Sequence, residues 1–248
     1  MNLIILAAGR GRRLYPLTKD RPKSLLELGD GTTLLDRQLS QAVAADCVTQ
    51  VTVVTGYRYD MIERCLDKYR DSVHVTTLYN PYFDASNALM SLWCSHHLML
   101  DEDFFISNGD NIYSDGFLQR AYRQSSEGIS LMISRKDHYD DDDMKVRKDS
   151  AGALAEVSKS LPHDRAQADS VGLVLVRGEV FRRQFRDTLL AMVHDPASVS
   201  AFWQESLNAL VSSGGSVMLH EVSRDSWAEV DFHPDIEAMR KAVLEKLL

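Results

Sequence analysis

Through the first half of the chain, short apolar runs of strand length alternate with amphipathic stretches of helical spacing. The runs cover residues 3–7, 51–55, 73–78, 104–107 and 129–134, and the helical stretches cover residues 34–45, 61–69, 87–98 and 116–124. Strands separated by helices of this length pair in parallel and place the helices on both faces of the sheet. The pattern predicts an α/β fold, with a Rossmann-like, mixed but mostly parallel sheet flanked by helices.

The second half keeps strands and helices but loses the regular alternation. We predict a hairpin from residues 144–147 and 153–157, strands at 170–176, 217–222 and 227–230, and helices at 179–192, 198–212 and 234–247. No linker rich in proline, glycine or serine separates the halves, and no internal repeat is visible. We therefore predict a single domain over residues 1–248, a length that α/β domains routinely reach.

Charge and cysteine content restrict the partners and the compartment. The net charge is -8, which argues against nucleic acid as a partner because phosphate-backbone binding needs a broad basic surface. Cys47, Cys65 and Cys94 have no metal-binding spacing and are typical of free thiols in a reducing compartment. The apolar run at residues 2–7 is too short for a signal peptide or a membrane span. We predict a cytoplasmic protein that binds no membrane, as a monomer or a homodimer.

The sharpest local feature is a basic loop with two glycines that leaves the first predicted strand. Only Asp20 opposes its six basic residues, which fall within fourteen positions: Arg10, Arg12, Arg13, Lys19, Arg21 and Lys23. Gly9 and Gly11 allow the backbone to approach an anion closely, and the basic side chains supply charged donors. The loop is neither a P-loop nor a dinucleotide fingerprint, since Leu14 stands where the third glycine would be. Although a solvated loop is the alternative, the cluster predicts a phosphate-binding site.

Residues 3–39 resemble the signature of the nucleotidyltransferase family that makes NDP-sugars and CDP-alcohols. The family motif LAAGxGxRLxPLTxxxPKxLLxL is met at every fixed position. The resemblance implies a nucleotide site formed by Leu6, Ala7, Ala8, Gly9, Gly11, Arg13 and Lys23. Ala7, Ala8 and Gly9 would line the base, whereas Arg13 and Lys23 would be the catalytic residues that stabilise charge on the reacting phosphates.

A second segment, residues 80–92, resembles an element of the phosphocholine cytidylyltransferase-like branch with the pattern NPxYxxTNNxxSL. This resemblance adds Ser86 and Asn87 to the nucleotide site, because an asparagine amide can bind a pyrimidine edge with one donor and one acceptor. Ala88 departs from the branch, which often has a second asparagine there. The alternative for Ser86 and Asn87 is a helix N-terminus with no ligand.

Two carboxylates match the metal-binding aspartates of the family. Asp110 follows a predicted buried strand, and Asp231 ends the segment Trp227–Asp231, which resembles the family element W-x-E-I-D. Two carboxylates together with triphosphate oxygens suit Mg²⁺, so Asp110 and Asp231 are the expected magnesium ligands. Each aspartate alone would more often be a helix cap or a surface charge.

Softer resemblance points to residues around the acceptor phosphate and the acceptor pocket: Lys145, Lys159, Gly172, Trp203 and Glu205. Aromatic side chains that could form a pocket wall for a quaternary ammonium are Tyr82, Trp93, Tyr113, Trp203 and Trp227. The run of four acids at residues 140–143 indicates a solvated loop.

The resemblance implies transfer of CMP from CTP to a small phosphorylated acceptor, with Mg²⁺ and release of pyrophosphate. The acceptor would be phosphocholine or a related phospho-alcohol or phosphonate. One alternative is a sugar-1-phosphate nucleotidyltransferase. Another is a non-catalytic nucleotide-binding regulatory relative, which is disfavoured because Arg13, Lys23, Asp110 and Asp231 are all present. A glycosyltransferase would be expected to carry a DxD motif, which residues 110–112 do not supply.

Overall fold

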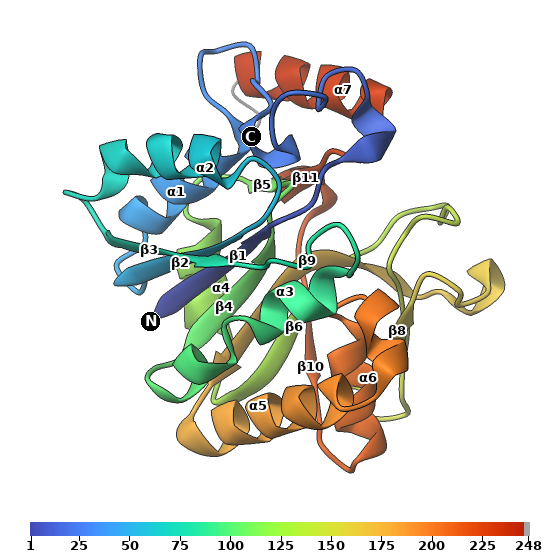
Figure 1. Cartoon of the computed structure of the whole chain (residues 1–248). Helices are drawn as coiled ribbons and strands as arrows, with labels where there is room; N and C mark the ends of the chain where they lie inside the picture. The colour runs from blue at the N-terminus through green and yellow to red at the C-terminus, as the bar shows by residue number, and fades with distance from the viewer. Residues whose placement is uncertain (246–248) are drawn as a thin grey trace.

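The computed structural model describes residues 1–245, which fold around one mixed sheet with helices on both faces (Figure 1). Along the sheet the strands are β10 (Met218–Glu221), β6 (Gly128–Ser134), β9 (Ala168–Arg177), β4 (Phe104–Asn108), β1 (Asn2–Ala7), β2 (Gln50–Thr55) and β3 (His74–Tyr79). The hairpin of β7 (Lys145–Lys148) and β8 (Leu154–Ser158) is attached through β7 to β9. The predicted fold class is confirmed.

Parallel pairing is confined to two parts of the sheet. β3, β2, β1 and β4 run parallel to one another, and so do β6 and β10. β9 lies between these parts and is antiparallel to both β4 and β6. In β1, Leu3 and Ile5 face one hydrophobic cluster and Ile4 faces the other, so the strand is apolar along its whole length because both faces are buried.

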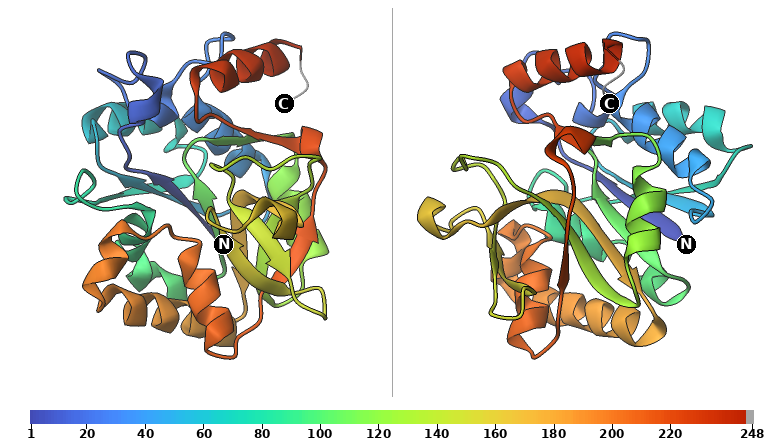
Figure 2. Two further views of the ribbon diagram at one scale, coloured as in Figure 1. Left: turned by 90° about the vertical axis from the view of Figure 1, so that its right-hand side faces the viewer. Right: turned by 180° about the vertical axis from the view of Figure 1, so that it is seen from behind.

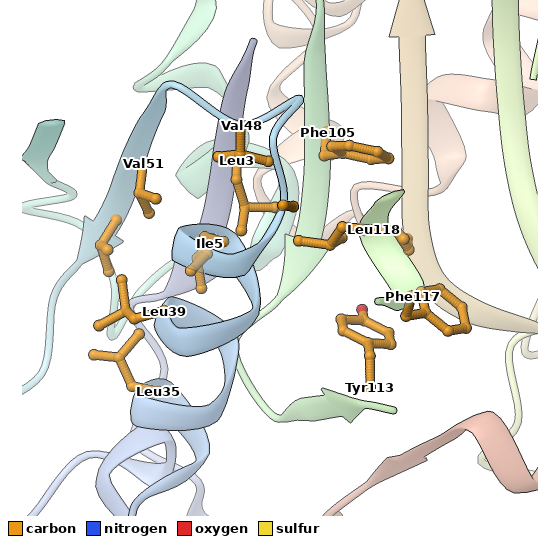
Figure 3. Close-up of a cluster of buried hydrophobic side chains, with 14 of the residues drawn as sticks. Leu3, Ile5, Leu35, Leu39, Val48, Val51, Phe105, Tyr113, Phe117 and Leu118 are labelled. Carbon is orange, nitrogen blue, oxygen red and sulfur yellow. The ribbon is translucent and has the colours of Figure 1, made fainter. Parts of the chain in front are cut away.

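Three helices cover each face of the sheet (Figure 2). On one face lie α1 (Leu34–Ala44), α2 (Tyr59–Leu66) and α4 (Phe117–Gln124), and on the other lie α3 (Ala88–Trp93), α5 (Glu179–Val193) and α6 (Glu205–Ser212). Figure 3 shows part of the first cluster, with Leu35 and Leu39 of α1 beside Ile5 of β1. Because β1, β2 and β4 run parallel, the loops that follow their carboxyl ends lie on the same edge of the sheet.

A third, smaller cluster fixes the loop that follows β1. α7 (His233–Leu244) lies beside that loop (Figure 1), and its Ile236 and Met239 belong to the same buried cluster as Leu14 and Leu28. A short antiparallel pair, β5 (Asn111–Tyr113) and β11 (Trp227–Glu229), leads the chain into α7. Residues far apart in the sequence are thereby brought together at the edge of the sheet. The last part of the predicted helix 234–247 lies outside the described residues.

Two predicted helices are wrong in extent. The helix predicted at 87–98 ends at Trp93, and the one predicted at 198–212 begins only at Glu205. The late start of α6 has a tertiary reason: the backbone N–H groups of Asn87 and Leu89 donate to the carbonyls of Val199 and Ala201. The segment before α6 is therefore extended at Ala201 and stabilises the first turn of α3 instead of continuing its own helix.

Two further observations bear on the compartment. No helix within residues 1–245 is long and apolar enough to cross a membrane. Cys47, Cys65 and Cys94 are free and partly buried. The cytoplasmic location and the oligomeric state stay predictions.

Candidate active site

The site lies where β1 and β4 end side by side. Leu6 is opposite Asn108 in the parallel register, so the loops that begin after these residues start next to each other. Gly109 makes the contact possible, because a Cβ there would lie 2.5 Å from the Leu6 carbonyl oxygen. Carboxyl ends of parallel strands are where α/β proteins bind ligands.

The glycine-containing loop is shaped to bring Lys23 under it. Gly11 has φ 65°, a left-handed conformation that favours glycine, and a Cβ there would lie 2.9 Å from the Cβ of Lys23. The Thr18 hydroxyl donates to the Gly11 carbonyl at 2.7 Å and closes the turn. Glycine is therefore required at residue 11 for both the backbone shape and the close approach.

Lys23 is the centre of the site. Its ammonium donates to Asp110 Oδ2 at 2.7 Å and to Asp231 Oδ1 at 2.8 Å. Burial opposes the charge, but the two carboxylates outweigh it and hold the pKa of Lys23 above its ordinary value. The lysine stays charged at every physiological pH.

The carboxylates around Lys23 fit a hard cation. Asp110 Oδ1 is buried and has no hydrogen-bond partner among the described residues. Burial, then the nearby Asp110 and Asp231, raise the pKa of Glu229 well above its ordinary value, so this carboxyl keeps its proton more readily than an ordinary glutamate. Oxygen ligands shared with a phosphate suit Mg²⁺. Within residues 1–245 no group of three or more His, Cys, Asp or Glu side chains could hold a metal ion, so substrate oxygens would have to complete the coordination.

Asp142 connects two basic side chains from different segments. Its carboxylate accepts from Arg13, and its Oδ1 accepts from the Lys159 ammonium at 2.9 Å. Burial raises the pKa of this carboxyl, but Lys159 and Arg13 outweigh that effect and hold it below its ordinary value. The expectation that residues 140–143 form only a solvated loop is therefore wrong. Asp142 sits as an anion between the two cations expected to bind phosphates.

On the opposite wall, Trp203 is fixed by a hydrogen bond. Its Nε1 donates to Asn108 Oδ1 at 2.7 Å. Gly172, with φ 68°, lies behind Asn108, and a Cβ there would be 2.6 Å from Asn108 Nδ2. The Lys159 ammonium lies 5.1 Å from the centre of the Phe202 ring, a cation–π distance.

Two adjoining cavities open between these walls. One, of about 260 Å³, includes Ser86, Asn87, Lys159 and Trp203, and the other, of about 310 Å³, includes Lys23. Both are lined by Leu6, Gly9, Arg13, Gly109, Asp110 and Asp231. Ala8 lines the first, and Ala7 and Gly11 line the second. The structure thus brings the predicted nucleotide residues, the two aspartates and Lys159 to one place.

Asn87 lines the cavity, but its amide already has protein partners. Its Oδ1 accepts from Ala88 N at 2.8 Å and caps α3, and its Nδ2 donates to the Ser200 carbonyl at 3.1 Å. Each end of the amide keeps one hydrogen-bonding position. Ser86 Oγ likewise donates to the Tyr82 carbonyl at 2.8 Å.

Three residues predicted to bind the acceptor do not line either cavity. Lys145 is 1% exposed, and its ammonium donates to the Asp140 carbonyl at 2.9 Å, so it supports the acidic loop from beneath. Glu205 Oε1 accepts from Phe202 N at 2.9 Å and ends the turn before α6. Gly172 lies behind Asn108 and Asn111, whose Nδ2 atoms would be 2.6 and 2.8 Å from a Cβ at this position. None of the three residues lines a cavity, so this geometry does not support their acceptor-binding roles, which stay predictions.

The predicted aromatic wall is also different. Tyr113 and Trp227 belong to the hydrophobic core, and Trp93 stacks on His96 at 5.5 Å between ring centres. Tyr82 is exposed. Only Trp203 of the five lines the cavity, together with Phe83 and Phe202.

Asp142, Glu229 and Gln204 also line the cavity, and of these three residues sequence reasoning missed Asp142. Glu229 lies within the segment Trp227–Asp231, and the resemblance of this segment to the family element is the sequence signal that indicates it. Gln204 stands between Trp203 and Glu205. The helix predicted at 198–212 began too early, and that error assigned the side chains of this turn to the wrong face. No sequence signal separates Asp142 from its three acidic neighbours.

Comparison with known proteins agrees with this geometry. The profile of the nucleotidyl transferase family matches residues 2–142. CTP:phosphoglutamine cytidylyltransferase from Campylobacter jejuni is 27% identical over 96% of this chain and 98% of its own. UTP–glucose-1-phosphate uridylyltransferase from Haloferax volcanii is 34% identical, but over 55% of each chain.

Among solved structures, CTP:phosphocholine cytidylyltransferase from Streptococcus pneumoniae has the same fold. It aligns with a TM-score of 0.79 over 98% of both chains at 16% identity. The family match spans more than half of the chain and contains the basic loop, Lys23 and Asp110. The protein is an enzyme of the nucleotidyltransferase class, and its chain belongs to the nucleotidyl transferase family.

Proposed function

We propose that this protein transfers CMP from CTP to a small phosphorylated acceptor and releases pyrophosphate. The observation that carries the proposal is the meeting of the two cavities at Arg13, Asp110 and Asp231, with Lys23 on one side and Lys159 on the other. The cavity that includes Lys23 can hold the triphosphate, and the acceptor cavity, which is the one that includes Lys159, can hold the acceptor phosphate. Asp142 supports this assignment, because an anion already bridges Arg13 and Lys159.

In the proposed reaction a phosphate oxygen of the acceptor attacks the α-phosphorus of CTP. A new P–O bond forms to the acceptor, the bond from the α-phosphorus to the bridging oxygen breaks, and pyrophosphate leaves on the opposite side. The nucleophile is already ionised, so no general base is needed. The residues align two polyanions and offset their repulsion, which is the main requirement of phosphoryl-type transfer.

Each basic residue has a distinct part in this scheme. Arg13 and Lys23 stabilise the charge that develops on the α-phosphate and the leaving pyrophosphate. Lys159 binds the acceptor phosphate. Asp142 has to release Arg13 and Lys159 when the substrates bind, because their phosphates compete for the same donors.

Asp110 and Asp231 are the proposed magnesium ligands, supported by the buried, unpartnered Oδ1 of Asp110. When bound, Mg²⁺ would neutralise phosphate charge and polarise the phosphoryl oxygens. Lys23 holds both carboxylates at present, and its ammonium can turn to the phosphates once a cation engages the aspartates.

CTP is proposed as the nucleotide because the relative from Campylobacter jejuni that matches nearly the whole chain is a cytidylyltransferase. The uridylyltransferase from Haloferax volcanii matches only about half of the chain, and this keeps a sugar-1-phosphate enzyme as the second candidate. For the acceptor, the match of the Campylobacter jejuni relative over nearly the whole chain favours a small phosphorylated compound over a hexose phosphate.

The test is pyrophosphate release from ATP, GTP, UTP and CTP, each with an acceptor set of phosphoglutamine, phosphocholine, 2-aminoethylphosphonate, glycerol 3-phosphate and glucose 1-phosphate. We expect release that requires both CTP and an acceptor other than glucose 1-phosphate. Efficient turnover of UTP with glucose 1-phosphate alone would establish the sugar-1-phosphate alternative instead.

A further inference from the structure

Gln204 is a buried amide in the wall of the acceptor cavity that the protein leaves unsatisfied. It is 4% exposed and lines the same cavity as Lys159 and Phe202. Its Oε1 is buried without a hydrogen-bond partner, and its side chain does not cap α6. Buried side-chain amides are nearly always hydrogen-bonded, so an amide of this kind in a cavity wall points to a ligand.

The residues on either side of Gln204 are already engaged. Trp203 has a single donor, and that donor is bound to Asn108 Oδ1 at 2.7 Å. Glu205 is bound to Phe202 N at 2.9 Å. The Oε1 of the Gln204 side chain has no hydrogen-bond partner within residues 1–245. At this turn, Gln204 is therefore the residue with hydrogen-bonding capacity left for a substrate.

The aspartates of the cavity are all paired in the protein without substrate. The carboxylates of Asp110 and Asp231 are paired with Lys23, and that of Asp142 with Arg13 and Lys159. Glu229 lies near Asp110 and Asp231, at the metal-binding end. Without substrate, each of these three aspartates is thus already paired with a protein cation, whereas the Oε1 of Gln204 has no partner.

We infer that Gln204 selects the acceptor by binding an amide or hydroxyl group at the end of the molecule opposite its phosphate. A side-chain amide has an N–H donor group and a carbonyl acceptor. Only a ligand group that both accepts and donates a hydrogen bond can pair with the donor and the acceptor of this amide. A quaternary ammonium forms no such hydrogen bond, a primary ammonium only donates, and a carboxylate only accepts. The inference rests on the proposed function and narrows its acceptor class.

The experiment compares kcat/KM with CTP for phosphoglutamine that carries its phosphate on the α-amino nitrogen, and so keeps a free carboxamide, and for glycerol 3-phosphate, phosphoethanolamine and phosphocholine. We expect the amide and hydroxyl acceptors to be preferred over phosphocholine by roughly tenfold or more, as for one hydrogen bond to a buried group. Gln204→Met keeps the size but removes the hydrogen bonds, so this preference should disappear through a higher KM for the acceptor, with KM for CTP unchanged. Gln204→Glu keeps the shape and adds charge, and should shift the preference toward phosphoethanolamine.

Gln41→Met is the matched control. Gln41 is also a buried amide with an unpartnered Oε1, but it lies on α1, donates to Asp115 and lines neither cavity. This substitution should leave the acceptor preference unchanged.

An unchanged preference in both Gln204 variants would overturn the inference, and so would a wild-type preference for phosphocholine. If wild-type protein turns over no acceptor, the proposed function fails, and binding decides the inference separately. Calorimetric binding of phosphoglutamine or glycerol 3-phosphate that weakens about tenfold in Gln204→Met supports it. Binding of equal strength in both proteins contradicts it.

Discussion

Lys23 keeps its charge in surroundings that would otherwise remove it. Burial favours the neutral amine, whereas Asp110 and Asp231, at 2.7 and 2.8 Å, favour the ammonium and determine the direction of the pKa shift. The same two carboxylates are the proposed magnesium ligands. In the proposed scheme, Lys23 would hold these two carboxylates together without substrate and supply charge to the phosphates once they bind.

Substitution of Lys23 tests this role. Lys23→Met should lower kcat by about 10²–10³-fold, the usual effect of removing a preorganised donor to developing charge. Steady-state kinetics with circular dichroism would show the loss in a folded protein. Arg21→Met is the control, because Arg21 lies in the same loop, pairs with Glu27 and lines neither cavity. A Lys23→Met protein with near-normal kcat would remove this lysine from the reacting centre.

Asp169 gives the protein a distinctive dependence of stability on pH. It is 3% exposed at the start of β9, and burial raises its pKa to about 7 despite Lys136 at 3.6 Å. The folded state therefore binds this proton more tightly than the unfolded state. Through this group the free energy of unfolding is highest below the ordinary aspartate pKa and falls as the pH rises toward 7.

Asp169→Asn should flatten that dependence. The difference in unfolding free energy between pH 5 and pH 8 should change by about 1–4 kcal/mol relative to the wild type, in favour of the variant at pH 8. Urea unfolding at the two pH values measures it. The exposed Asp71 serves as the control through Asp71→Asn. Parallel pH profiles for wild type and Asp169→Asn would mean that Asp169 is not buried as an acid.

At the scale of elements, one glycine of β9 supports the cavity wall that contains Trp203. Gly172 combines φ 68° with a site where a Cβ would lie 2.6 Å from Asn108 Nδ2. Asn108 in turn holds the indole of Trp203. A substitution at Gly172 should therefore displace Asn108 and, through it, the Trp203 indole that lines the cavity.

Gly172→Ala should lower the free energy of unfolding by about 1–3 kcal/mol and raise KM for the acceptor more than KM for CTP. Gly152→Ala separates strain from contact, because Gly152 has φ 85° but open space around its Cβ position. It should cost stability without changing either KM. Equal effects of the two substitutions on KM would contradict a path from Gly172 through Asn108 to Trp203.

The same elements show what the sequence can and cannot predict. β1 was predictable because both its faces are buried, which leaves an unbroken apolar run. β5 has only three residues and no periodicity to detect. Lys145 belongs to a correctly predicted hairpin, but alternation along a strand does not say which face meets the cavity. The start of α6 depends on contacts with α3, which no local pattern encodes.

At the scale of the molecule, the site joins segments more than a hundred residues apart. The basic loop and Asp110 come from the half matched by the family profile, whereas Lys159, Trp203 and Asp231 come from the other half. The motif residues could be placed together from sequence because the motif is long and specific. The positions of Asp142 and Gln204 in the site could not be predicted, because they depend on how the second half of the chain folds back onto the first.

Asp110 and Asp231 should act as a unit because both hold Lys23 and both are proposed to bind one Mg²⁺. Asp110→Asn and Asp231→Asn should each abolish Mg²⁺-dependent pyrophosphate release. In a double-mutant cycle the combined loss should be much smaller than the product of the two single losses. Multiplicative losses would show that the two aspartates act independently.

The most direct test of the proposed reaction follows each phosphorus of CTP. With CTP labelled at the α-position, the label should appear in a CMP–acceptor product, and with CTP labelled at the γ-position it should appear in pyrophosphate, one for each product formed. Transfer of the γ-label to the acceptor, or its release as orthophosphate, would contradict attack at the α-phosphorus and with it the account of this site.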